Sequence, residues 1–304
     1  MNPIRKSLAV ATLGLPVLLA GQAHAVVVAF DSFENGPSVG QTSTKGNDAF
    51  DSTDLAWFSS LDFGTASLQN DSFAGGGSLK ALQLSSPDTF RRLTAAFPTT
   101  TLGANAGDQL VLSFDMRLTE APTSNQVGFR FGLFNSAGTS IASDNPNGVN
   151  QPTQQNDDFG YVVKISTGTP TALENSITDE SAGNNPTGGT VLAGETVLGS
   201  AVSPISINDQ LKHTFSLTLE RVGPSLISLS FVADGILKTT ALDATPFLTF
   251  DTIHIAQGNV STDFRIDNVR VETLLAAAAV PEPATLSLAA LGMVALMRRR
   301  HVRA

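Results

Sequence analysis

The stretch His213–Leu242, HTFSLTLERVGPSLISLSFVADGILKTTAL, decides the fold class of this chain. Apolar and polar residues alternate on both sides of the turn-forming segment Arg221–Ser225, which is the period of a half-buried strand. The dipeptide Asp234-Gly235 supplies the preferred residues of a tight hairpin turn. We therefore predict three consecutive antiparallel strands, over His213–Arg221, Leu226–Ala233 and Ile236–Leu242.

The same alternation recurs through much of the chain, and between residues 26 and 275 no stretch keeps a 3.6-residue period for three turns. The run Gln109–Leu118 places five apolar side chains on one face. Further strands are predicted at Leu79–Leu84, Val127–Phe134, Phe159–Ile165, Thr252–Gln257 and Phe264–Glu272. Many short strands separated by turn residues predict an all-β fold, an antiparallel two-sheet jelly-roll sandwich. The polar regions Ser143–Asp158 and Asn175–Gly199 are interpreted as long loops.

The segment His213–Phe231, with the turn that follows it, resembles the late strands of concanavalin A-like jelly rolls. The closing segment Phe264–Glu272 is similar to the terminal strand of many extracellular jelly-roll modules. The resemblance implies that this strand pairs with the opening segment Val26–Glu34. It also favours carbohydrate binding, although a fold by itself does not fix a function.

The C-terminus has three parts in a fixed order. Pro281 and Pro283 keep the first part extended, because proline fixes φ and lacks an amide hydrogen. The uncharged apolar stretch 284–297 would form a helix about 21 Å long, short of the ~30 Å hydrocarbon core of a bilayer. The basic tail 298–304 should stay in the cytoplasm by the positive-inside rule. The residues that define the pattern are Val280, Pro281, Glu282, Pro283, Arg298, Arg299 and Arg300.

This pattern resembles the PEP-CTERM sorting signal of Gram-negative bacteria. In that family an exosortase, a membrane-embedded transpeptidase-like enzyme, acts at or near the motif and the passenger is released or moved to the outer surface. The resemblance implies an exosortase-type partner, transient anchoring in the inner membrane by a transmembrane sorting helix, and a final place at the cell surface or outside. An ordinary C-terminal membrane anchor is the alternative.

The N-terminus reads as a signal peptide. Arg5 and Lys6 are its positive region, Leu8–Ala20 its apolar region, and Ala23-His24-Ala25 a small-x-small cleavage site. We therefore predict a signal peptide over 1–25, a β-sandwich passenger over 26–275, and a sorting signal over 276–304 with its motif at 280–283. An uncleaved N-terminal transmembrane helix is the alternative.

Composition excludes several functions. The net charge is −9, and both ends are basic, so the passenger is more acidic still. Such a charge argues against binding nucleic acid or anionic lipid. The chain has no cysteine, which excludes disulfides and thiolate chemistry.

No catalytic constellation stands out in the sequence, and we predict that the protein is not an enzyme. A glycoside hydrolase needs two facing carboxylates, whereas Asp179 and Glu180 would point opposite ways on a strand and lie in a polar region. We interpret them as solvated surface acids. His213 and His254 are interpreted as structural residues at the surface or half-buried.

Two binding sites are candidates. If the first and last strands pair, Asp31 and Glu34 approach Asp267, an arrangement that resembles the structural calcium site of several carbohydrate-binding jelly rolls. A second calcium candidate is the loop Asp144–Gly148 with Asp157-Asp158, and a merely polar turn is the alternative for both. Trp57, the single tryptophan, is a candidate stacking platform for a sugar ring, with core packing as its alternative.

These observations predict an exported, surface-sorted protein that serves as a structural or adhesive component of the extracellular matrix or exopolysaccharide. A carbohydrate-binding module, with extracellular polysaccharide as its partner, is the first alternative. A polysaccharide hydrolase or lyase is the second.

Overall fold

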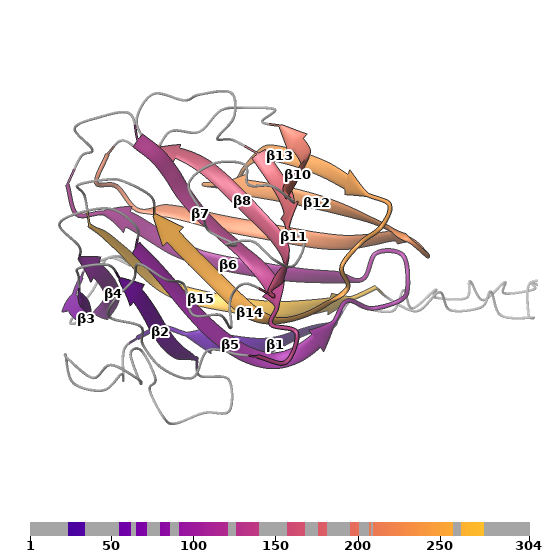
Figure 1. Cartoon of the computed structure of the whole chain (residues 1–304), viewed down its shortest axis with the longest axis horizontal. Helices are drawn as coiled ribbons and strands as arrows, with labels where there is room; N and C mark the ends of the chain where they lie inside the picture. The colour runs from indigo at the N-terminus through magenta and orange to yellow at the C-terminus, as the bar shows by residue number, and fades with distance from the viewer. Residues whose placement is uncertain are drawn as a thin grey trace, which may run out of the picture. The chain divides into compact units, whose positions relative to one another are not determined.

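The computed structural model describes residues 24–33, 55–61, 65–71, 80–85, 91–120, 126–139, 157–167, 176–180, 195–200, 207, 209–257 and 263–276. These residues form strands and turns, with no helix among them (Figure 1). The predicted all-β class is confirmed. The predicted signal peptide, sorting motif and transmembrane sorting helix lie outside the described residues.

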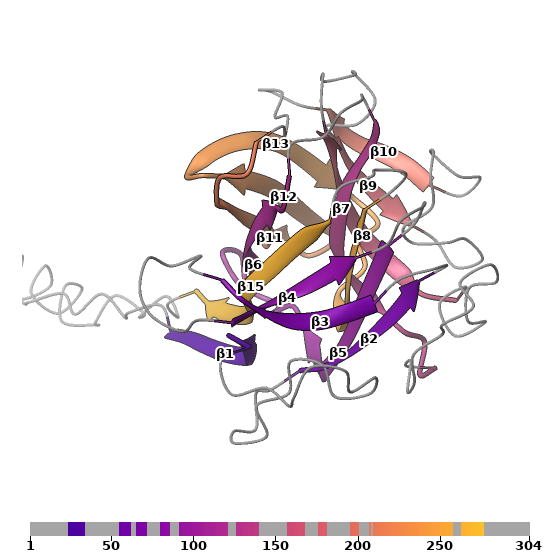
Figure 2. The ribbon, with the colours of Figure 1, turned by 90° about the vertical axis from the view of Figure 1, so that its left-hand side faces the viewer.

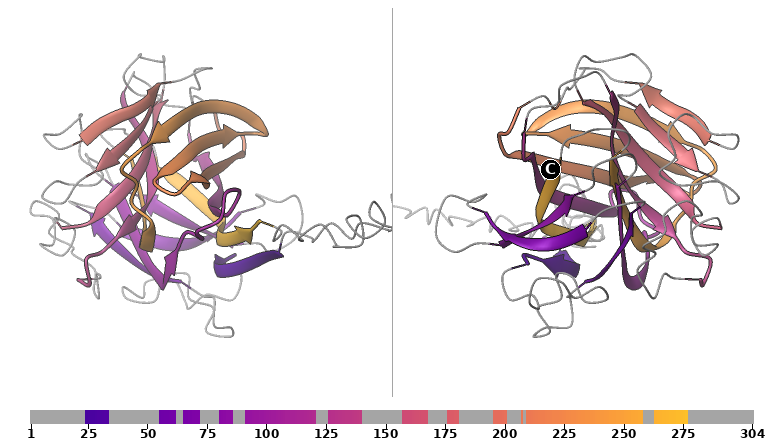
Figure 3. Two further views of the ribbon diagram at one scale, coloured as in Figure 1. Left: turned by 90° about the vertical axis from the view of Figure 1, so that its right-hand side faces the viewer. Right: turned by 60° about the vertical axis from the view of Figure 1, so that its left-hand side comes forward.

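The strands form two antiparallel sheets that face each other (Figures 1 and 3). The eight-stranded sheet has the order β13-β12-β11-β6-β15-β4-β3, with β1 also paired to β15, and the seven-stranded sheet has the order β10-β9-β8-β7-β14-β5-β2. The strands are β1 (His24–Asp31), β2 (Ala56–Leu61), β3 (Thr65–Asn70), β4 (Lys80–Ser85), β5 (Arg91–Thr101), β6 (Gln109–Leu118), β7 (Gln126–Asn135), β8 (Phe159–Thr167), β9 (Ser176–Glu180), β10 (Glu195–Ser200), β11 (His213–Gly223), β12 (Leu226–Ala233), β13 (Ile236–Asp243), β14 (Thr249–Gln257) and β15 (Phe264–Leu275).

The predicted hairpins are present at β11, β12 and β13. Buried and partly exposed residues alternate along the whole of β12, as the sequence period requires. Asp234 and Gly235 have φ values of 52° and 75°, and both values suit the two central residues of a type I′ turn. The Asp234 N–H donates to the Thr214 carbonyl, which joins this turn to the start of β11.

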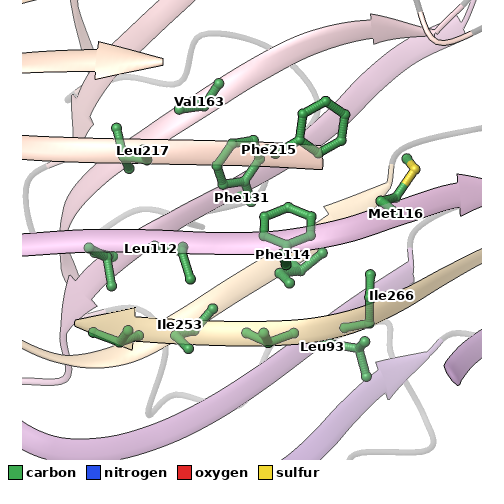
Figure 4. Close-up of a cluster of buried hydrophobic side chains, with 14 of the residues drawn as sticks. Leu93, Leu112, Phe114, Met116, Phe131, Val163, Phe215, Leu217, Ile253 and Ile266 are labelled. Atoms are coloured by element: carbon green, nitrogen blue, oxygen red, sulfur yellow. The ribbon is translucent and has the colours of Figure 1, made fainter. Parts of the chain in front are cut away.

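The core lies between the sheets and is rich in phenylalanine. Phe114 of β6 faces Phe131 of β7, with ring centroids 4.9 Å apart and planes at 83° (Figure 4). Phe215 of β11 stacks on Phe131 at 5.9 Å and 19°. Leu112 and Met116 flank Phe114 on the same strand, and all five side chains are buried. Alternation along β6 and β11 thus supplies one wall of the core, and β7 the other.

The first and last strands pair, as the resemblance implied. β1 runs antiparallel to β15, with His24 opposite Leu275 and Asp31 opposite Val269 (Figure 2). On its other side β15 pairs with β6 over most of its length. The last strand among the described residues is therefore an interior strand of the sheet.

The described strands belong to one compact unit, His24–Ala276. The predicted domain limits at 26 and 275 remain predictions. The region Asn175–Gly199 corrects one interpretation, because it contains strands β9 and β10 where loops were expected. These strands are short and carry polar residues on a buried face, so they lack the usual alternation.

One edge of the sandwich is closed by a close backbone contact. A Cβ atom added to Gly199 of β10 would lie 2.3 Å from the Thr240 carbonyl oxygen of β13. Only glycine permits this approach of the two edge strands. The contact joins the seven-stranded sheet to the eight-stranded one.

Candidate functional site

Trp57 and Asp31 form one buried unit. The Trp57 Nε1–H donates to Asp31 Oδ2 at 2.9 Å, and Trp57 has no exposed surface. Phe33 packs against the indole ring, with centroids 5.9 Å apart. A buried indole offers no free face to a sugar, so this placement corresponds to the core-packing alternative for Trp57.

In the described part of the predicted calcium site, both oxygens of Asp31 and one oxygen of Asp267 accept hydrogen bonds from the protein. Asp31 Oδ1 accepts the Phe33 N–H at 2.8 Å, and its other oxygen accepts from Trp57. Asp267 Oδ1 accepts the Asn268 N–H at 2.7 Å. Glu34 lies outside the described residues. Within the ranges that the structure describes, no group of three or more acidic or histidine side chains that could hold a metal ion is found.

Asp115, which the sequence analysis passed over, is the cross-strand partner of Asp267. Like charges directly opposite each other destabilise a sheet unless other groups compensate. Asp115 accepts the Thr214 hydroxyl at 2.7 Å and the Asn268 amide at 3.0 Å, and Lys212 lies 3.3 Å away. Donors from the protein therefore satisfy this carboxylate without an ion.

In the second calcium candidate, the two described aspartates also bond to other groups of the protein. Asp157 accepts the Thr139 hydroxyl at 2.9 Å, and Asp158 is bonded to His254. The loop Asp144–Gly148 lies outside the described residues. The two aspartates thus point to different partners on the protein.

A group of buried polar and charged side chains lies on the seven-stranded sheet, on the face that points away from the core. We call this group the polar face. Its members are all less than 10 % exposed: Thr94, Arg130, Asp158, Lys164, Thr178, Glu180, Glu195 and His254. Burying charges is costly unless they are paired, so such a group needs internal partners or a ligand.

Strand register brings the charged members of the polar face together. Arg130 is opposite Lys164 across β7 and β8, and Glu180 is opposite Glu195 across β9 and β10. Lys164 and Glu195 form a buried ion pair. Burial lowers the pKa of Lys164, an effect that the hydrogen bond to Glu195 opposes. This arrangement corrects the interpretation of Glu180 as a solvated acid, because its side chain is fully buried.

A hydroxyl–imidazole–carboxylate chain crosses the other part of the polar face. The Thr94 hydroxyl lies 2.9 Å from His254 Nδ1, and His254 Nε2 lies 2.6 Å from Asp158 Oδ2. The Phe134 ring stands edge-on to the imidazole at 4.8 Å. All four residues are buried, so His254 is neither at the surface nor half-buried as interpreted.

The chemistry of the polar face is that of a paired internal network. Glu180 and Glu195 are directly opposite on neighbouring strands, and such residues have Cβ atoms about 5 Å apart. Glu195 is engaged by Lys164, however, and both glutamates are buried. No sequence signal pointed to this network, because its members come from strands far apart in the chain.

His213, the first residue of β11, has two acidic neighbours. Its Nδ1 lies 2.9 Å from Asp234 and its Nε2 lies 3.1 Å from Asp209. The ring is stacked parallel to Phe215. This half-buried histidine thus secures the hairpin turn at Asp234, in agreement with a structural role.

Residues 279–300 match the family described as the PEP-CTERM protein-sorting motif. The match covers the proline motif, the apolar stretch and the arginine cluster, so the C-terminus carries this sorting motif. None of the described residues forms a helix long and apolar enough to cross a membrane. A comparison with curated proteins gives no match.

Solved structures with a similar strand arrangement include carbohydrate-binding proteins and enzymes. The Emp46p carbohydrate recognition domain in its potassium-bound form is 13% identical, with 71% of this chain and 87% of that chain covered and a TM-score of 0.45. Peanut lectin is 11% identical, with 84% and 99% covered and a TM-score of 0.44. The endo-beta-1,4-glucuronan lyase of the fungus Trichoderma reesei is 11% identical, with 81% and 95% covered and a TM-score of 0.39. Similarity at this level assigns neither a ligand nor an activity to this chain.

Proposed function

We propose that this protein is an exported substrate of an exosortase-type enzyme, and that its β-sandwich acts at the cell surface as a structural or adhesive component of the extracellular matrix or exopolysaccharide. The sorting motif at residues 279–300 carries the proposal. It begins a few residues after β15 ends at Leu275. The folded unit and the processing motif are therefore nearly adjacent in the chain.

The stability of the β-sandwich supports a structural role. It has no cysteine, so its stability in the extracellular environment rests on the core and on internal polar pairs. Examples are the Trp57–Asp31 hydrogen bond and the Lys164–Glu195 ion pair. The proposal contains no catalytic step.

The test follows the full-length chain in an exosortase-containing bacterium and in a strain without that enzyme. We expect a shortened, surface-exposed product only in the first strain. A variant with Pro281→Ala and Pro283→Ala should stay uncut, whereas Pro98→Ala, at an exposed position of β5, should be cut normally. Equal processing of all variants in both strains would refute the sorting proposal. An unchanged biofilm matrix after deletion of the gene would refute the structural role alone.

Carbohydrate binding is the second candidate, and one observation on the polar face favours it. Among the described residues, the Thr178 hydroxyl and Asp158 Oδ1 are buried and have no hydrogen-bond partner. Sugar hydroxyls donate and accept, so they would suit these groups; because the groups are as buried as Trp57, a sugar would reach them only when the protein opens locally. We expect a matching glycan to raise the melting temperature by binding the native state, and Thr178→Val to remove that rise. A melt unchanged by every polysaccharide tested would eliminate this candidate.

The proposed calcium ion would be held by Asp31, Glu34 and Asp267, and the oxygens of Asp31 would keep accepting their N–H donors. Calcium should raise the melting temperature of the purified passenger, and a chelator should reverse the rise. An identical melt in calcium and in chelator would remove the ion from the proposal.

A further inference from the structure

The turn between β5 and β6 is folded around one buried carboxylate. Asp108 is 1% exposed, and its Oδ2 accepts the Asn105 N–H at 2.8 Å. The Asp108 carbonyl accepts the Arg221 N–H at 2.8 Å, and the Gly107 N–H donates to the Arg221 carbonyl at 2.7 Å. These bonds tie the turn firmly to β11.

The other oxygen of this carboxylate holds the end of the last strand. The Ala276 N–H donates to Asp108 Oδ1 at 2.8 Å. Gly107 of the same turn has a φ of 90°, and a Cβ atom there would lie 3.2 Å from the Ala276 Cβ. Ala276 is the last residue of the compact unit, so the turn grips the point from which the chain continues to the sorting motif.

Removal of the predicted signal peptide would make the hydrogen bond between Asp108 and Ala276 more important. In the structure, Ala25 and His24 are opposite Leu274 and Leu275. Cleavage before Val26 would remove both partners, while pairing with β6 ends at Leu274. In the mature protein Asp108 would then be the final attachment of Ala276 to the sandwich.

We propose that Asp108 is a positioning residue for processing at the sorting motif, an inference that rests on the proposed function. With Ala276 held, the covalent chain cannot place Val280 Cα more than about 14 Å from Ala276 Cα. Releasing Ala276 and Leu275 would extend this reach by roughly 7 Å. A processing enzyme must enclose the motif beside the folded β-sandwich. The Asp108–Ala276 hydrogen bond keeps the motif close to the sandwich, so it restricts the access of the enzyme and slows cutting.

The test measures the cutting rate by pulse–chase with full-length chain and exosortase in cells. Asp108→Ala should speed cutting several-fold, and so should a Gly-Ser-Gly insertion after Ala276. If the insertion alone gives the enzyme enough room at the motif, releasing Ala276 should add no further rate, so the combined variant should be cut no faster than the insertion alone. Amide hydrogen exchange at Ala276 should rise in Asp108→Ala.

Two matched variants separate positioning from general destabilisation. Asp108→Asn keeps one acceptor oxygen, which can serve either the Ala276 N–H or the Asn105 N–H but not both, so its cutting rate should lie between those of wild type and Asp108→Ala. Asp251→Ala removes the bonds to the Ser136 N–H and hydroxyl on the other sheet and should leave the rate unchanged. A wild-type rate in Asp108→Ala, or equal acceleration in Asp251→Ala, would overturn the proposal for Asp108. A wild-type chain that is never cut would instead refute the proposed function.

Discussion

Replacing Tyr161 by phenylalanine deletes one oxygen atom from the core and little else. The Tyr161 hydroxyl donates to Asp243 Oδ2 at 2.6 Å and accepts the Phe247 N–H at 2.9 Å. Tyr161 is fully buried and Asp243 is 5% exposed. Loss of a hydrogen bond to a charged group costs about 1.5–3 kcal/mol, and the partly buried Phe247 N–H adds a smaller term. We expect Tyr161→Phe to lower the free energy of unfolding by about 2–4 kcal/mol.

For a domain of this size, that loss lowers the melting temperature by roughly 4–16 °C. Differential scanning calorimetry and urea unfolding of the purified passenger measure it, and the ring contacts with Phe247 and Phe250 should survive. Asp243→Asn and the double variant complete a mutant cycle, in which the two changes should be strongly non-additive. A loss below about 0.5 kcal/mol, or simple additivity, would show that the hydroxyl is not the partner on which Asp243 depends.

Burial, reinforced by Asp243, raises the pKa of Tyr161 well above 10. The native state should therefore lose stability as pH rises above about 10, where the tyrosine of the unfolded chain ionises. The absorbance of this single tyrosine reports its ionisation, and Tyr161→Phe should remove this part of the dependence of the unfolding free energy on pH. Lys164→Met leaves Glu195 buried without its cation and should lower the free energy of unfolding, measured in urea, by about 3–5 kcal/mol. Adding Glu195→Gln to this variant should restore much of that free energy. Gly199→Ala should lower the free energy of unfolding by about 1–3 kcal/mol. Gly223→Ala should leave it nearly unchanged, because the added Cβ would lie 3.6 Å from the Leu226 Cβ, an ordinary contact distance.

The strands that were predictable share one property, a half-buried face that imposes a period of two. The run Gln109–Leu118 was delimited correctly, and the hairpins after His213 followed from their turn residues. Strands β2, β3, β5, β9 and β10 were missed, and in β9 the reason is that Ser176, Thr178 and Glu180 are polar yet buried. Their burial depends on neighbouring strands, which local sequence does not reveal.

The polar face was unpredictable for a related reason. His254 meets Asp158 across 96 residues and Thr94 across 160 residues. A hydrogen bond over such separations follows from sheet order and register, not from any spacing in the chain. The sorting motif was predictable, in contrast, because its three parts are contiguous in sequence.

The interior place of β15 has a mechanical consequence. This strand leads directly to the C-terminal tail, and it lies between β6 on one side and β1 and β4 on the other. Tension applied through the tail would run along β15 and load its ladders in shear, so many hydrogen bonds would have to break together. An edge strand would instead peel off one bond at a time. The order of strands in the sheet thus places an interior strand, and not an edge strand, at the end that leads to the C-terminal tail.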